Sequence, residues 1–231
     1  MTTLTVPYCA IIPAAGSGRR SGRSEPKQFV EIVGESILRH TLRIFAEDAS
    51  CVQIIVPIDA VWRAYGEAAA RGFETVGFVD GGAVRQESIA NALEACADHL
   101  DIVVVHDAVR PLATRRLIAS VVDAADRDGA AIPALPIDET IKRVREGRVV
   151  ETVPRDELYT AQTPQAFRKE LLRRAYMAAS ESGTVGTDDA SLIEMVGATV
   201  TIVPGEYSNI KITWPDDFER AASLLASQSD E

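Results

Sequence analysis

Apolar runs of strand length alternate with amphipathic runs of helix length along most of this chain, and this alternation limits the folds that it can adopt. Apolar faces recur at helical spacing in the intervals between the apolar runs. Repeated strand–helix units predict a mostly parallel sheet with helices on both faces, which is a Rossmann-like α/β fold. The expected strands are 8–13, 51–56, 73–79, 101–105 and 130–135, and the expected helices are 37–46, 60–71, 84–98 and 114–126.

The alternation breaks at residues 136–158, where two β-rich stretches flank Glu146-Gly147. This pattern predicts a β-hairpin. A two-stranded ribbon is marginally stable alone, so we expect the hairpin to be a protruding arm that packs on a second copy of the chain and forms a homodimer. The arm is then an insertion in a single domain that spans residues 1–231. Helices are expected again at 168–180, 189–196 and 215–226, and strands at 199–203 and 209–213.

The overall charge excludes two classes of partner. The chain has a formal net charge of −10, and we therefore expect neither nucleic acid nor an anionic membrane surface to bind it non-specifically. No apolar stretch approaches the ~18 residues that a membrane span needs, and no signal peptide is expected. The three cysteines, Cys9, Cys51 and Cys96, are odd in number and form no Cys-x-x-Cys pair. We interpret them as buried free thiols of a cytoplasmic protein.

A basic, glycine-rich loop follows the first strand, between Ala15 and Gln28. Connections of this kind usually have about 2–6 residues, so the length of this one suggests a function. Four of its residues are basic and one is acidic, and its glycines allow backbone N–H groups to approach an anion closely. The loop therefore predicts a polyphosphate site. Ser21 stands where a dinucleotide fingerprint has its third glycine, which argues against a dehydrogenase, and no Walker sequence is present.

Two further segments follow the ends of expected strands, where α/β sheets bind their ligands. The first is Asp80-Gly81-Gly82 with Arg85 and Ser88 after it. A flat base could lie against the two glycines and Ser88 could reach a ligand, although an ordinary turn is an equally simple interpretation.

The second segment is His106-Asp107-Ala108-Val109-Arg110-Pro111. Asp107 is placed to approach a divalent cation or a sugar hydroxyl and Arg110 to approach a phosphate, but a structural salt bridge would have the same sequence. His106 is interpreted as a structural histidine. The Thr187-Asp188-Asp189 run is either part of a site or a plain helix N-terminus, and Lys211, in an apolar run, needs a partner.

The residue types favour nucleotidyl or phosphoryl transfer. The sequence offers no Ser–His–Asp set, no Cys–His pair and no cluster of metal-binding His and Cys. A phosphate monoester has a second pKa of about 6 and attacks without a general base. What it needs is neutralisation of the repulsion between two anions, which Lys27, Arg20 and Mg²⁺ could supply.

Seven motifs, spread in order over nearly the whole chain, resemble those of the 2-C-methyl-D-erythritol 4-phosphate cytidylyltransferase family of the non-mevalonate isoprenoid pathway. They are Pro13-Ala-Ala-Gly-Ser-Gly-Arg-Arg20, Pro26-Lys-Gln-Phe29, Val105-His-Asp-Ala-Val-Arg-Pro111, Thr140-Ile-Lys-Arg143, Thr163-Pro-Gln165, Thr187-Asp-Asp-Ala-Ser191 and Asn209-Ile-Lys-Ile-Thr213.

The resemblance implies that CTP and 2-C-methyl-D-erythritol 4-phosphate react, with Mg²⁺, to give 4-diphosphocytidyl-2-C-methyl-D-erythritol and pyrophosphate. It implies that Arg20 and Lys27 stabilise the transition state, and that the arm lends Arg155 to the site of the neighbouring subunit. Asp107 is also the expected metal contact. The expected substrate-binding residues are Asp107, Arg110, Thr140, Arg155 and Lys211. The expected nucleotide-binding residues are Pro13, Ala14, Ala15, Gly16, Ser17, Gly18, Lys27, Gly81, Gly82, Arg85, Ser88, Asp107 and Ala108.

Two alternatives compete with this interpretation. A ribitol 5-phosphate cytidylyltransferase would have the same fold and chemistry, but its members usually have Ala-Gly-Gly where this chain has Ala14-Ala15-Gly16, and they lack Lys142-Arg143. A non-catalytic nucleotide-binding module would not need all the charge-neutralising groups. The chain departs from the family pattern at Ser21, Ala83 and Glu139, none of which is expected to stabilise the transition state.

Overall fold

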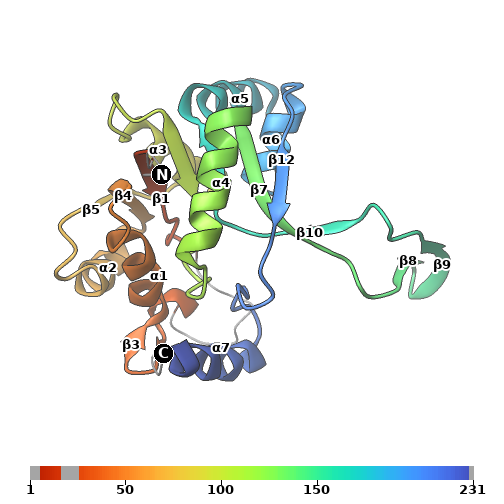
Figure 1. Cartoon of the computed structure of the whole chain (residues 1–231), viewed down its shortest axis with the longest axis horizontal. Coiled ribbons are helices and arrows are strands. Elements are labelled where there is room, and N and C mark those ends of the chain that lie inside the picture. Colours follow the sequence, from red (N-terminus) through yellow and green to blue (C-terminus); the bar gives the residue numbers. More distant parts are fainter. Residues whose placement is uncertain (1–5, 17–25, 229–231) are drawn as a thin grey trace, which may run out of the picture.

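A computed structural model describes residues 6–16 and 26–228 of the chain (Figure 1). Within these residues, eight strands form one sheet in the order β10-β7-β11-β6-β1-β4-β5, and β12 pairs with β7. The fold class predicted from the alternation of strands and helices is confirmed. The strands are β1 (Tyr8–Ile11), β4 (Cys51–Ile58), β5 (Val76–Asp80), β6 (Ile102–Val105), β7 (Ala130–Pro136), β10 (Tyr159–Ala161), β11 (Gln165–Arg168) and β12 (Thr201–Pro204).

The sheet is mixed rather than wholly parallel. Strand β1 pairs in parallel with β4 and β6, and β5 continues the parallel part beyond β4. Strand β11 lies between β6 and β7 and is antiparallel to both, and β10 is antiparallel to β7. These two strands were not expected from the sequence. The chain returns from the arm directly into them, without the crossover helix that a parallel pair requires.

Helices cover both faces of the sheet (Figure 1). Alternate residues of β1 point to opposite faces: Ala10 packs in one cluster with α1 and α4, whereas Cys9 and Ile11 pack in another with α3, α5 and α6. Burial on both faces explains why the central strands are almost continuously apolar. The helices are α1 (Ile37–Ala46), α2 (Arg63–Ala69), α3 (Arg85–Glu94), α4 (Arg115–Asp128), α5 (Lys169–Ser182), α6 (Asp189–Met195) and α7 (Pro215–Gln228).

Side-chain caps fix where three of these helices begin. Ser36 accepts a hydrogen bond from the backbone N–H of Arg39 before α1, and Thr114 does the same for Leu117 at the start of α4. Asp188 forms a capping box with Ser191 ahead of α6. The sequence-based interpretation of Asp188 as part of a helix N-terminus is therefore confirmed.

Residues 209–213 are not a strand, contrary to the expectation from their alternating apolar pattern. Ile212 is fully buried in a third cluster together with Phe218 of α7, and Ile210 packs against this cluster. The backbone N–H of Ile212 donates to the carbonyl of Val109. The alternation thus serves burial against a helix and a loop, and these contacts take the place of a β-ladder.

The predicted hairpin is present, with strands β8 (Ile141–Arg145) and β9 (Arg148–Val153), and it projects away from the sheet (Figure 1). Glu146 and Gly147 both have positive φ values, 48° and 74°, as a tight hairpin turn requires. Within the described part of the chain, β8 and β9 form a sheet only with each other. The exposed valines of this arm, Val144, Val149 and Val150, are 53–63% accessible.

Candidate active site

Three loops meet at the carboxyl ends of the central strands, where the sequence predicted a site. The backbone N–H of Ala14 donates to Pro57, that of Gly81 donates to Ile58, and that of His106 donates to Ile11, each at 2.9 Å. These bonds extend the ladders of β1, β4 and β6 by a few residues. The described start of the first loop, the glycine turn after β5 and the loop after β6 therefore lie beside one another.

A cavity of about 450 Å³ opens between the first loop and the turn after β5. Gln28, which is buried, ties the first loop down by donating its amide to the carbonyls of Ala14 (2.6 Å) and Gly16 (3.0 Å). A nucleoside could fit into this cavity. Its lining is Pro13, Ala15, Gly16, Asp59, Gly82, Ala83, Val84, Arg85 and Ser88.

Gly81 and Gly82 are glycines because the backbone passes other groups closely here. A Cβ atom on Gly81 would lie 2.5 Å from the Cβ of Ala15, and one on Gly82 would lie 2.3 Å from the Cβ of Glu87. Ser88 fastens the same turn, since its Oγ accepts from Gly82 N–H at 3.0 Å and donates to the Val84 carbonyl at 3.1 Å. The turn is thus a rigid wall of the cavity.

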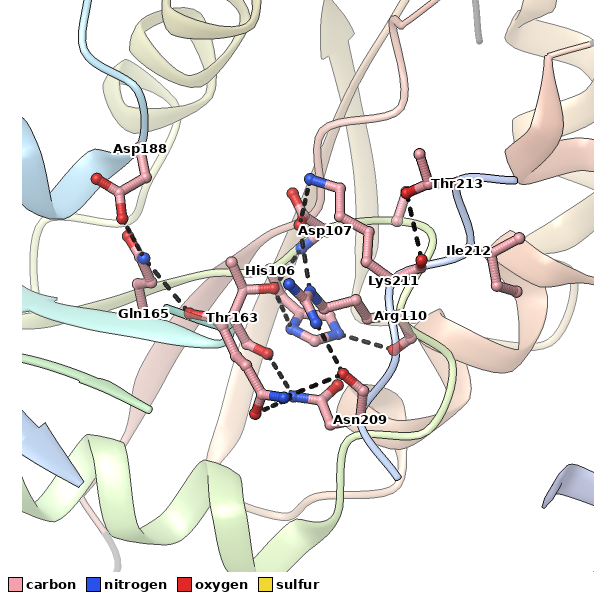
Figure 2. Close-up of polar contacts among 12 residues, drawn as sticks. His106, Asp107, Arg110, Thr163, Gln165, Asp188, Asn209, Lys211, Ile212 and Thr213 are labelled. Carbon is pink, nitrogen blue, oxygen red and sulfur yellow. Dashed lines mark hydrogen bonds and ion pairs between the residues drawn. The ribbon is translucent and has the colours of Figure 1, made fainter. Parts of the chain in front are cut away.

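Asp107 lies at the centre of a cluster of cations beside this cavity (Figure 2). Its Oδ2 atom is 2.9 Å from the ammonium of Lys211 and 3.4 Å from Nε of Arg110, and its Oδ1 atom is 3.9 Å from Arg85. Burial alone would raise the pKa of Asp107, but the three cations hold this pKa well below its usual value. Asp107 is therefore ionised at neutral pH. The partner that Lys211 was predicted to need is this carboxylate.

Two lysines from distant parts of the chain meet at the segment 209–213. Lys27 begins a short 3₁₀ turn (Lys27–Phe29), and its Nζ donates to the carbonyl of Ile212 at 2.7 Å. The neighbouring Lys211 reaches Asp107, and Nη1 of Arg110 donates to the carbonyl of Asn209 at 2.7 Å (Figure 2). Lys27, from the end of the first loop, and Asp107, from the loop after β6, therefore contact adjacent residues of one segment, Ile212 and Lys211.

His106 is a structural residue, as its sequence context predicted. It is fully buried, its Nε2 is 3.0 Å from the Arg110 carbonyl, and its Nδ1 is 3.1 Å from Oγ1 of Thr163 (Figure 2). A carbonyl can only accept, so Nε2 carries the hydrogen and Nδ1 accepts from the hydroxyl. Burial lowers the pKa of His106 to about 4, and the ring is therefore neutral at pH 7.

A second cavity, of about 730 Å³, adjoins the cation cluster on the side of the arm. Arg110, Lys211 and Trp214 line it together with the chain that leads into the arm, residues 135–139. Three basic and three acidic side chains line it, and of these Arg110 and Lys211, which lie against Asp107, suit a phosphate. The cavity lies at the base of the arm, and a second substrate could fit into it.

The residues predicted to bind substrate from the arm stand apart from this cluster. Thr140 lies just before β8 and Arg155 just after β9, and both are exposed. Among the described residues, neither forms a hydrogen bond or an ion pair with Asp107, Arg110 or Lys211. Ser17, Gly18 and the predicted catalytic residue Arg20 lie outside the described residues.

Sequence reasoning missed Asp59 altogether, and it named Asp189 only as a member of the Thr187-Asp188-Asp189 run, without a partner. Asp59 follows β4 and lines the first cavity, although the end of that strand was not among the three segments selected. Asp189 is buried and its Oδ2 accepts from Nη2 of Arg85 at 2.8 Å. An aspartate directly after a helix cap gives no sign in the sequence of which way it points.

The chemistry of the donor set is compatible with a divalent cation that is held mainly by a nucleotide. Within residues 6–16 and 26–228, no group of three or more His, Cys, Asp or Glu could hold a metal ion. Asp107 is a single carboxylate, and among the described residues its Oδ1 forms no hydrogen bond, with Arg85 3.9 Å away. Mg²⁺ commonly takes one or two carboxylates and completes its shell with phosphate oxygens and water.

A Rossmann-like sheet with a nucleoside-sized cavity and a cation cluster at its carboxyl edge defines a nucleotidyltransferase-type α/β protein. The family model for 2-C-methyl-D-erythritol 4-phosphate cytidylyltransferase matches residues 8–227. The chain belongs to the 2-C-methyl-D-erythritol 4-phosphate cytidylyltransferase family. The resemblance inferred from the seven motifs is confirmed, and the chain is a nucleotidyltransferase.

Relatives and solved structures support this assignment. Proteins of this name from Bacillus mycoides (224 residues compared; 96% of this chain, 99% of the relative) and Acidobacterium capsulatum (232 residues; 95% and 97%) are each 45% identical to this chain. The crystal structure of 4-diphosphocytidyl-2C-methyl-D-erythritol synthase from Anaerococcus prevotii superposes with a TM-score of 0.85 at 31% identity, over 96% of this chain and 99% of that one. The enzyme from Thermus thermophilus gives 0.82 at 36% identity, over 96% and 100%. Among the described residues, no helix has both the length and the apolar character needed to cross a membrane.

Proposed function

We propose that the two cavities divide the substrates between them, with CTP in the cavity beside the glycine turn and 2-C-methyl-D-erythritol 4-phosphate beside Asp107. The family reaction joins these two compounds to give 4-diphosphocytidyl-2-C-methyl-D-erythritol and pyrophosphate, a step towards isoprenoid precursors. The single observation that carries the proposal is the meeting of Lys27, Lys211 and Asp107 at residues 209–213, between the cavities.

On the nucleotide side, the rigid glycine turn offers a flat backbone surface to the base. Residues Pro13 to Gly16 offer the ends of the first loop to the ribose and phosphates, together with Ser17 and Gly18 in the part of the loop outside the described residues. Arg85, Ser88 and Ala108 complete this side. Lys27 and Arg20 neutralise the charge that builds up on the α-phosphate as it is attacked.

On the substrate side, Asp107 accepts hydrogen bonds from hydroxyl groups of the methylerythritol, and Arg110 and Lys211 neutralise its phosphate. This phosphate is already largely ionised at neutral pH because its second pKa is about 6. A neutral, fully bonded His106 is consistent with a mechanism that needs no general base. The chain therefore contributes orientation and positive charge rather than proton transfer.

We propose Mg²⁺ as the divalent ion of this site, with Asp107 as its contact in the chain. When bound, it would neutralise phosphate oxygens of CTP. Asp107 would serve it through Oδ1, because Oδ2 is already close to Lys211 and Arg110. A carboxylate oxygen has two lone pairs, so Oδ1 can also accept from a hydroxyl group of methylerythritol. Asp107 would then orient the ion from the side on which the second substrate enters.

The arm, residues 136–158, is proposed to join two subunits into a homodimer and to carry Thr140 and Arg155 to the neighbouring site. Its exposed valines and its separate two-stranded sheet support this proposal. We propose a cytoplasmic location. This location suits an enzyme that consumes CTP, and its reducing conditions suit a protein with three buried free thiols.

A pyrophosphate-release assay tests the function directly. The protein is incubated with each of CTP, UTP, ATP and GTP, together with either methylerythritol 4-phosphate or ribitol 5-phosphate, with and without EDTA. We expect release only with CTP and methylerythritol phosphate and only without EDTA. Faster release with ribitol 5-phosphate would favour the alternative substrate, and an absence of release with every pair would contradict a catalytic role.

A further inference from the structure

Asp189 carries a buried carboxylate that the start of its helix does not need. The capping box of α6 is supplied by Asp188, whose Oδ1 accepts from the backbone N–H of Ser191 at 2.9 Å. The side chain of Asp189 is only 1% exposed. A buried charge is costly unless it is paired and hydrogen-bonded, so the partners of this carboxylate indicate what it does.

Both oxygens of Asp189 have a fixed donor from another helix. Oδ2 accepts from Nη2 of Arg85 in α3 at 2.8 Å, and Oδ1 accepts from the hydroxyl of Tyr176 in α5. Burial and the nearby charge of Asp189 hold the pKa of Tyr176 well above its usual value, so the phenol keeps its proton and donates it. The direction of the carboxylate is therefore set from two sides.

Arg85 stands between this carboxylate and Asp107. The Nη2 atom that lies 2.8 Å from Asp189 is 3.9 Å from Oδ1 of Asp107, which is too far for a hydrogen bond. Burial would lower the pKa of Arg85, but the charges of Asp189 and Asp107 raise it above its usual value, so the guanidinium is permanently charged. One cation thus lies between two carboxylates and is hydrogen-bonded to that of Asp189.

We propose that Asp189 is a positioning residue, which holds Arg85 away from Asp107 and leaves Oδ1 of Asp107 available to the second substrate. Because Lys211 and Arg110 already lie against Oδ2, Oδ1 is the oxygen that Arg85 would occupy without Asp189. The inference rests on the role of Asp107 in the proposed function.

The first test is Asp189→Asn, which keeps the shape of the side chain and removes its charge. Steady-state kinetics are measured at saturating CTP and Mg²⁺. We expect the KM for methylerythritol phosphate to rise about tenfold with little change in kcat. Arg85 loses its charged hydrogen-bond partner Asp189 and is then free to occupy Oδ1 of Asp107, which the substrate needs. Glu194→Gln is the matched control, because it removes one negative charge from an exposed position of the same helix, and its KM should stay near that of the wild type.

The decisive comparison adds Arg85→Gln, which removes the competing cation. We expect the double variant D189N/R85Q to regain the KM for methylerythritol phosphate of R85Q alone, whatever R85Q does to the KM for CTP. A merely structural role of Asp189 would leave the raised KM unrescued, and this result would overturn the inference. An unchanged KM in D189N would overturn it as well.

A milder variant keeps the test open if circular dichroism shows that D189N is unfolded. Tyr176→Phe removes only the phenolic donor, and we expect a rise in the same KM of about threefold that R85Q again removes. In that case, an unchanged KM in Y176F would reject the proposal. Turnover by the wild type tests the proposed function separately, since all the comparisons above are made relative to it.

Discussion

The ammonium group of Lys27 donates a hydrogen bond to the backbone carbonyl of Ile212, a residue 185 positions further along the chain. The adjacent Lys211 pairs with Asp107. Residues from the beginning, the middle and the end of the sequence are thereby held within one cluster. A substitution of Lys27, Asp107 or Lys211 is expected to affect the reaction more than the fold.

Lys27→Met should lower kcat by a factor on the order of 10³, since it removes a positive charge that stabilises the transition state. Lys27→Arg, which keeps the charge with a different shape, should retain more activity than the methionine variant. Initial rates of pyrophosphate release measure both. A kcat of K27M near that of the wild type would show that Lys27 does not act on the reacting phosphate.

The arm should control assembly. We expect Val149→Glu, which places a charge on the exposed apolar face of the hairpin, to shift the protein from dimer to monomer in sedimentation analysis and to reduce turnover. Val185→Glu makes the same change at an exposed position on the body and should leave the dimer intact. A wild-type protein that sediments as a monomer would contradict the proposed role of the arm.

Arg155 should act in the site of the neighbouring subunit. Arg155→Ala alone should be nearly inactive, and so should Lys27→Met. Mixed dimers of the two variants contain one complete site, so subunit exchange should restore up to about a quarter of wild-type activity. Mixing Lys27→Met with Asp107→Asn is the control, because Lys27 and Asp107 both act in the site of their own protomer and each site of a mixed dimer then carries one defect. Equal recovery in the two mixtures would disprove the exchange of Arg155.

The buried His106 should make the protein less stable in mild acid. Its pKa in the folded state is about 4, against 6.5 for a free histidine, so the unfolded state binds the extra proton between these values. The free energy of unfolding should therefore fall by up to about 3 kcal/mol as the pH drops from 6.5 to 4. Asp107, Arg110 and Lys211 face this ring, and Asp107 itself loses its stabilising charge only at lower pH.

Urea unfolding in metal-free buffer at a series of pH values measures this effect. His106→Gln lacks the titrating group, so its stability should fall less over the same range than that of the wild type. His99→Gln, at an exposed position, should follow the wild type. Parallel curves for the wild type and H106Q would show that His106 is not responsible.

The sequence predicted the central sheet well because the apolar runs of its strands are buried on both faces and leave few alternatives. It also identified Asp107 and the glycine turn, since these follow strand ends directly. It did not predict β11, whose direction depends on how the chain returns from the arm. It was wrong about residues 209–213, because alternation alone does not distinguish a strand from a segment that packs on a helix.

The sequence pointed to the Thr187-Asp188-Asp189 run but did not distinguish the roles of its two aspartates. Asp188 and Asp189 are adjacent and chemically identical, yet one caps a helix and the other is buried against Arg85. Their roles differ because α6 packs so that Asp189 reaches Arg85 of α3 and Tyr176 of α5. The direction of a side chain next to a cap is a tertiary property, and local residue preferences carry no information about it.

Strand β1 is paired on both edges and all four of its residues are buried. Its backbone amides therefore reach solvent only when the whole domain opens, and their hydrogen–deuterium exchange should be among the slowest in the molecule. The strand that leads directly into the first loop is thus held rigidly by its neighbours in the sheet. Residues Pro13 to Gly16, which follow this strand, therefore start from a point that the sheet holds in place.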